Sequence, residues 1–371
     1  METPETQPRF RKDGKVNWYR CRIDKDLLAE LKRTSDWRGY SQALGHLGMW
    51  FATGCLSYLA FRNVTAATAY WSVPLLLVAL FAHGTVGAFI GGSPCHELSH
   101  KTPFKNKKAN EFFFRVFSFF GWFDRVGYRP SHIRHHQLTV YHDYDGEVVL
   151  PLHMSFKGWK FWLGMLAWNP MTTWYTFRTF YRRATGRVEG EWMEFLFPEN
   201  NELARRKFRN WHAFVLVGHA VLATIFISTG HWFLVMLFNI GSHCCHWLTF
   251  LTGVPQHIGL KPDVPDHRLC CRTFTCGWLP GFLYWNMQYH ADHHMFPAVP
   301  FFNLPKLHAA IRHDMPPVPH GLRATWKEIR AIVKRQQEDP GYYYVPPLPG
   351  ESEGTHAGDE VLEREAALTG A

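Results

Sequence analysis

Four long apolar segments constrain the fold of this 371-residue chain more than any other feature. A helix crosses the hydrocarbon core of a bilayer with about 20 apolar residues. Segments near that length lie at 43–61, 69–90, 211–227 and 232–251. Only short turns separate the first from the second and the third from the fourth, which leaves no room for a folded domain. The sequence therefore predicts an all-α integral membrane protein with four transmembrane helices in two hairpins.

Basic residues predict the orientation of these helices. Lys and Arg are frequent before residue 43 and in the loop between the two hairpins, whereas the outer turns carry only Arg62. By the positive-inside rule, both termini and the central loop lie in the cytoplasm, at the bacterial inner membrane or the endoplasmic reticulum. The polar N-terminus lacks the pattern of a cleavable signal peptide, so we expect the first apolar segment to act as the membrane signal.

The excess of basic residues also bears on partners. The formal charge is +9 and the isoelectric point about 9.1. No nucleic-acid motif accompanies this charge, so we expect membrane lipid as a partner and no nucleic acid. A basic cytoplasmic surface can also hold an anionic ligand.

The rest of the chain divides around the apolar segments. We expect a cytoplasmic N-terminal segment at 1–42, a membrane domain with a cytoplasmic helical cap at 43–308, and a cytoplasmic C-terminal segment at 309–371. Two shorter apolar stretches, 112–123 and 159–177, carry charges or many aromatics and suit the membrane interface better than its core. The composition after about residue 346 predicts disorder.

Three histidine clusters stand beside the apolar segments, on the predicted cytoplasmic side. Their members are His96 and His100; His132, His135 and His136; and His290, His293 and His294. Residues three or four apart share one side of a helix, so each cluster can direct its ring nitrogens to one place. Histidine is the commonest neutral metal ligand. Eight imidazoles exceed the needs of one zinc ion and suit two metals, with Zn, Cu, Fe and Ni all compatible.

Two other functions can be read from these clusters. The first cluster, His-Glu-Leu-Ser-His, fits the zinc-protease pattern with Glu97 as general base, but that reading leaves the other two clusters unexplained. A histidine-rich metal transporter or sensor is a rival from another class. Transport ligands should lie within the spans, whereas these clusters lie outside them.

The three clusters resemble the histidine boxes of the membrane fatty acid desaturase superfamily. The third is the most specific, because residues 286–297, Asn-Met-Gln-Tyr-His-Ala-Asp-His-His-Met-Phe-Pro, resemble that family's box almost throughout. Pro255-Gln-His257 is similar to a family stretch that supplies one more ligand. The first box, His96 to Lys101, is also similar to that of membrane alkane hydroxylases.

The resemblance implies a non-haem di-iron site in the cap, with O2 as co-substrate and nine histidine ligands. They are His96, His100, His132, His135, His136, His257, His290, His293 and His294. His243 and His246 are further candidates as ligands or pocket groups. Glu97, Asp292, Asp143 and Asp145 are candidates to orient ligands through the second ring nitrogen.

The resemblance also implies the reaction. Hydrogen would be abstracted from an unactivated C–H bond of a fatty acid or acyl thioester, most simply to give a double bond. Hydroxylation of a fatty acid or alkane, or decarboxylation to a terminal alkene, would use the same centre. The chain has no haem, flavin or ferredoxin motif. We therefore expect an external electron donor, ferredoxin or cytochrome b5 with its reductase.

Overall fold

The computed structural model describes residues 16–147, 158–350 and 355–356. Most of the predicted disordered tail lies outside these residues. In chain order the elements are β1 (Tyr19–Arg20), α1 (Lys25–Leu31), α2 (Asp36–Arg62), α3 (Ala69–Gly87), α4 (Ser93–His100), α5 (Lys107–Phe120), α6 (Arg125–Leu138), α7 (Trp159–Leu166), α8 (Pro170–Ala184), α9 (Glu191–Leu196), α10 (Glu202–Ser228), η1 (Val235–Asn239), η2 (Gly241–His243), α11 (Trp247–Gly253), η3 (Val254–Gln256), α12 (His267–Cys270), α13 (Trp278–Leu283), α14 (His290–Met295), η4 (Phe301–Asn303), α15 (Leu304–Ile311), η5 (Arg312–Asp314), α16 (Gly321–Glu338) and β2 (Thr355–His356).

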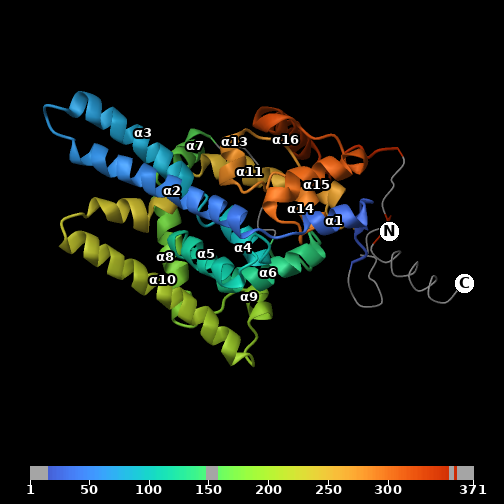
Figure 1. The fold of residues 1–371 in the computed structure, drawn as a ribbon, viewed down its shortest axis with the longest axis horizontal. Coiled ribbons are helices and arrows are strands. Elements are labelled where there is room, and N and C mark those ends of the chain that lie inside the picture. The colour runs from blue at the N-terminus through green and yellow to red at the C-terminus, as the bar shows by residue number, and fades with distance from the viewer. Residues whose placement is uncertain (1–15, 148–157, 351–354, 357–371) are drawn as a thin grey trace, which may run out of the picture.

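The fold is almost entirely helical, as the sequence predicts. Its only strands among the described residues are β1 and β2, two residues each, which pair antiparallel. Two long arms, the α2–α3 hairpin and α10 with the segment after it, extend from a body of shorter helices (Figure 1). The body contains α4, α5, α6, α14 and α15, which is the region predicted to form the cap.

Two described helices, α3 and α10, are long and apolar enough to cross a membrane. They contain most of the second predicted span and all of the third. The first predicted span, 43–61, lies within the continuous 27-residue helix α2. That helix begins at Ser35, whose side chain accepts a hydrogen bond from the Arg38 amide, which is a common way to satisfy a free helical N–H group.

The fourth predicted span, 232–251, is not one continuous helix, so the prediction of a transmembrane helix there is not confirmed. A π-helical turn at η1 and a 3-10 turn at η2 are followed by an extended Cys244 and by Cys245 at φ 54°, before α11 begins. Side chains from elsewhere in the chain form hydrogen bonds with carbonyl oxygens that the break in the helix leaves without backbone partners. His83 lies 3.0 Å from the Leu237 oxygen, and Trp122 donates to the Asn239 oxygen at 2.7 Å. An irregular backbone in an apolar medium is tolerated only where protein groups satisfy its hydrogen bonds.

The two shorter apolar stretches form helices of 14, 8 and 15 residues, which are shorter than the length of about 20 residues that a membrane span needs. Residues 159–177 divide into α7 and α8, with Ala167 extended between them and Asn169 capping α8. The stretch at 112–123 lies mainly in the amphipathic helix α5, whose Phe113, Phe114 and Phe117 are buried. The interfacial placement of both stretches stays a prediction.

A close backbone contact fixes α4 against α5. A Cβ on Gly91 would lie 2.6 Å from the Gly121 carbonyl oxygen, and a Cβ on Gly121 would lie 2.5 Å from the Gly91 nitrogen. Real Cβ atoms do not approach so closely, so both positions need glycine. The contact places the start of α4, and with it the first histidine cluster, against the end of α5.

Candidate metal centre

Three short helices carry most of the histidines of the candidate site. Helix α4 has Pro94 in its first turn and ends at Lys101, which has φ 61°. Helix α6 begins at Asp124, whose side chain accepts from the Gly127 amide. All six residues of α14 are buried. These short, closely packed helices hold their imidazole rings inside the body of the protein.

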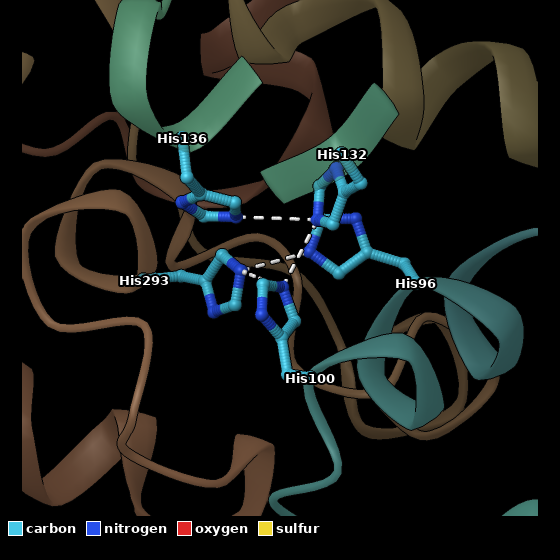
Figure 2. Close-up of side chains that lie close together, drawn as sticks. All are labelled: His96, His100, His132, His136 and His293. Atoms are coloured by element: carbon cyan, nitrogen blue, oxygen red, sulfur yellow. Dashed lines mark hydrogen bonds between the residues drawn. The ribbon is translucent and has the colours of Figure 1, made fainter. Parts of the chain in front are cut away.

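Five histidines form a first group, in which each ring offers a nitrogen within 4.8 Å of the others: His96, His100, His132, His136 and His293. Their rings point toward one another from α4, α6 and α14 (Figure 2). The Nε2 atoms of His96 and His293 are 2.8 Å apart, and those of His100 and His132 are 3.0 Å apart.

Four histidines form a second group with the same limit of 4.8 Å: His135, His257, His290 and His294. The Nε2 atoms of His257 and His290 are 2.9 Å apart. The two groups touch, because His136 of the first stacks on His294 of the second with ring centroids 4.2 Å apart. The nine predicted histidines thus form two adjacent groups, one of five rings and one of four.

The second and third clusters do not each converge on one place, contrary to our expectation. In α6, His132 and His136 face the first group, whereas His135 faces the second. In α14, His290 and His294 face the second group, whereas His293 faces the first. The i, i+4 pair lies on one side of the helix and the third histidine is rotated away from it. Each helix therefore serves both groups.

The outward ring nitrogens are held by the surrounding protein. His132 Nδ1 lies 2.6 Å from Glu147 Oε1, and His135 Nδ1 lies 2.7 Å from Asp145 Oδ2. His257 Nδ1 donates to the Cys270 carbonyl oxygen at 2.9 Å. With Nδ1 donating its proton, the Nε2 lone pair is directed into the group, as in many histidine–metal sites.

Burial favours the neutral form of eight of the nine imidazoles by lowering their pKa. Burial lowers the pKa of His100 and of His257 to about 3. Burial also lowers the pKa of His135, but the Asp145 carboxylate outweighs that effect and raises it. Neutral imidazole is the form that binds metals.

The donor set fits metal ions. Lone pairs that face each other across about 3 Å repel unless a proton or a cation lies between them. The buried Nε2 of His294 has no hydrogen-bond partner among the described residues. Buried nitrogens without partners are costly, and a bound cation in each group would satisfy them.

The four carboxylates predicted to orient ligands differ in whether they contact a histidine of the site. Asp145 does contact a histidine of the site, and Asp143 is exposed. Glu97 Oε1 lies 3.6 Å from His293 Nδ1, and burial raises the pKa of Glu97 to about 8. Asp292 contacts none of the nine rings. It accepts from Thr273 at 2.6 Å and lies 2.9 Å from His308 Nδ1, so it positions α14 against its neighbours.

Other histidines lie outside the two groups. His243 Nδ1 contacts Thr173 Oγ1 at 3.1 Å, and neither His243 nor His246 belongs to a group.

Sequence reasoning missed Glu147, the partner of His132, because no motif marks its position. It also missed His267, a buried ring that stacks on Trp18 at 3.9 Å and lies 5.4 Å from the ring of His294.

Comparison with known proteins agrees with this geometry. No curated protein matches the chain. The family described as fatty acid desaturase matches residues 69–326, which include α3, α10 and all nine histidines. Proteins of this family are membrane-associated oxidoreductases that act on fatty acyl chains. The match covers well over half of the sequence, and the chain belongs to the fatty acid desaturase family.

Proposed function

We propose that this protein is an O2-dependent membrane oxidoreductase that introduces a double bond into a fatty acyl chain, with a pair of iron ions at the two histidine groups. The observation that carries the proposal is the division of nine imidazoles, six of them buried and three half-buried, into a group of five and a group of four. Two adjacent groups of neutral nitrogen donors suit two transition-metal ions. Iron ions bound there would supply the reductive activation of O2 and the removal of hydrogen from carbon.

The protein's own residues position and shield the site. Glu147 and Asp145 hold two of the rings in place through their Nδ1 atoms. His293 and His294 are almost fully buried, so bulk water has little access to them. Exclusion of water limits side reactions at an oxidising centre.

We further propose that α2, α3, α10 and the broken segment 232–251 form the four-span membrane part, with both termini in the cytoplasm. The large charge asymmetry between the central loop and the outer turns supports this orientation. An acyl chain would then reach the site from the membrane. Its carboxyl or thioester end would remain at the basic cytoplasmic side.

Desaturation and its alternatives differ only in the product. A saturated R–CH2–CH2–R′ segment, O2, two electrons and two protons give R–CH=CH–R′ and two water molecules. The same inputs give an alcohol and one water molecule if oxygen is transferred to carbon. The similarity of residues 96–101 to alkane hydroxylases makes the alcohol the second candidate, and a terminal alkene by decarboxylation the third.

One experiment tests the function and the metal together. The purified protein is analysed for metals, then supplied with a fatty acyl substrate, O2 and a reductant, and the products are identified by mass spectrometry. We expect about two iron ions per chain and an alkene that His293→Ala does not form. Labile zinc without oxygen consumption would contradict the proposal and favour a metal transporter or sensor.

A further inference from the structure

One face of α16 carries a row of exposed cations that the metal site does not use. Arg323, Lys327, Arg330 and Lys334 are four, three and four residues apart, which places them along one side of the helix. We call this row the α16 stripe. None of the four forms an ion pair with a described carboxylate. A surface hollow of about 500 Å³ lies between Trp326 and three of them.

An adjacent face of α16 packs onto the segment that carries His257. The Trp326 ring donates to the Leu251 carbonyl oxygen at 2.9 Å, and Ile329 and Val333 are buried against Val254 and Ile258. In Figure 1 the helix lies beside α11, away from the tip of the α2–α3 hairpin. The α16 stripe is therefore on the body of the protein and separated from the second histidine group by one layer of packing.

Hydrogen bonds connect this helix to the residues around His257. Glu328 of α16 pairs with the buried Arg272 at 3.1 Å. Arg272 donates to the carbonyl oxygens of Pro255 at 2.6 Å and Ile258 at 3.1 Å, and its amide donates to Gln256 at 2.8 Å. Arg272 thus holds the backbone on both sides of His257.

We propose that the α16 stripe is the docking surface for an acidic one-electron carrier protein, which delivers electrons to the second histidine group. This inference rests on the proposed function. Charge complementarity steers such partners and sets the rate of encounter more than the final affinity. Redox partners meet through small interfaces, below about 1,200 Å² in total.

The number of electrons that the proposed reaction needs is compatible with a one-electron carrier that docks twice per turnover. Each turnover of the proposed reaction consumes two electrons, so two reduced carriers dock in turn and each leaves oxidised by one electron. The two electrons, with two protons from solvent and two hydrogens from the substrate, convert O2 to two water molecules. A carrier of iron–sulfur or haem type meets this requirement.

A second basic surface offers a matched comparison. Exposed Arg206, Lys207 and Arg209 lie in the first turns of α10, and the first and last of them line a hollow of about 450 Å³. This end of α10 packs against α8 and α6. Equal charge at this different place makes α10 the control for α16.

The test measures binding first and turnover second. The full chain in lipid nanodiscs is titrated with an oxidised ferredoxin chosen for its acidic surface. We expect the triple variant R323E/K327E/R330E to raise the Kd at least tenfold and to flatten its dependence on salt. The triple variant R206E/K207E/R209E should leave the Kd within about twofold of wild type. Equal weakening by both variants, or by neither, would overturn the proposal.

Turnover separates failure of docking from failure of the proposed function. With dithionite and methyl viologen as reductant, both triple variants should form product at the wild-type rate, while the α16 variant should be slow with reduced ferredoxin. Loss of the methyl viologen rate in the α16 variant alone would also overturn the docking proposal, because the stripe would then support the site itself. If the stripe binds lipid instead, the α16 variant would keep the wild-type Kd for ferredoxin and lose a dependence of its melting temperature on phosphatidylglycerol.

Discussion

His132 and Glu147 form the contact that most clearly defines the orientation of a ring in the metal centre. Their Nδ1 and Oε1 atoms are 2.6 Å apart, while His132 Nε2 faces His100 Nε2 at 3.0 Å. One side of the ring is thereby anchored and the other is left to bind a cation. Asp145 acts on His135 in the same way.

The first prediction concerns these two carboxylates. Glu147→Gln and Asp145→Asn should each lower metal affinity about 10- to 100-fold, because an oriented, more basic imidazole is lost. Chelator competition with metal analysis measures the effect. Asp143→Asn is the control, since Asp143 is exposed in the same segment. Wild-type metal retention in both test variants would show that the carboxylates do not support the site.

The second prediction uses two adjacent histidines that face different groups. His135→Ala and His136→Ala should each lose about one metal ion, and the ion that is left should differ between them. Mössbauer spectra of protein loaded with ⁵⁷Fe show which of the two iron ions remains in each variant. His142→Ala should keep the wild-type spectrum, because His142 is exposed and pairs with Asp263 at 2.7 Å. Identical residual spectra in the first two variants would refute the division into groups.

The third prediction is a loss of stability of the metal-free protein in acid. His100 and His257 have a pKa of about 3 when folded, against 6.5 for the free side chain, because burial disfavours their charged form. The unfolded chain therefore binds more protons as the pH falls below about 6.5. Each such group lowers the free energy of unfolding by up to about 1.4 kcal/mol per pH unit down to about pH 3.

Thermal unfolding of the metal-free protein in detergent, at several pH values from about 7.5 to 5.5, measures this loss. His135, Glu97 and Glu147 oppose it, because their raised pKa values give stability that disappears as the pH rises. The histidines with lowered pKa outnumber these three groups, so the melting temperature should fall on acidification. A His100→Gln variant should show a smaller slope. A melting temperature that rises in acid would refute the assignment of neutral rings.

The fourth prediction concerns the contact between Gly91 and Gly121. Gly121→Ala should destabilise the protein by about 1–3 kcal/mol, the usual range for overpacking, and should displace α4 with His96 and His100. Unfolding and metal content measure both effects. Gly48→Ala is the control, because a Cβ there meets nothing within 4 Å. A Gly121→Ala protein with the wild-type melting temperature would show that the backbones can separate at little cost.

The long helices and the spacing of the histidines could be predicted from the sequence, because both depend on residues close together in the chain. Apolar runs of sufficient length gave the positions of α2, α3 and α10, since a helix satisfies its own backbone in an apolar medium. The histidine spacing on short helices identified eight rings, and the family resemblance added His257. The broken segment after α10 was not predictable, because its irregular backbone depends on His83 and Trp122, which are far away in the chain.

The sequence by itself determined which nine histidines lie together, because their spacing and flanking residues are local properties. Only the tertiary structure decided how they divide. His135 and His136 are neighbours in the chain, yet His136 joins rings of α4 and α14, whereas His135 joins His257 and two other rings of α14. The choice of Glu147 and Asp145 over Asp143 and Asp292 likewise depends on how the chain turns after α6. A helical period fixes the angle between two side chains, whereas the group that each one meets is fixed by packing.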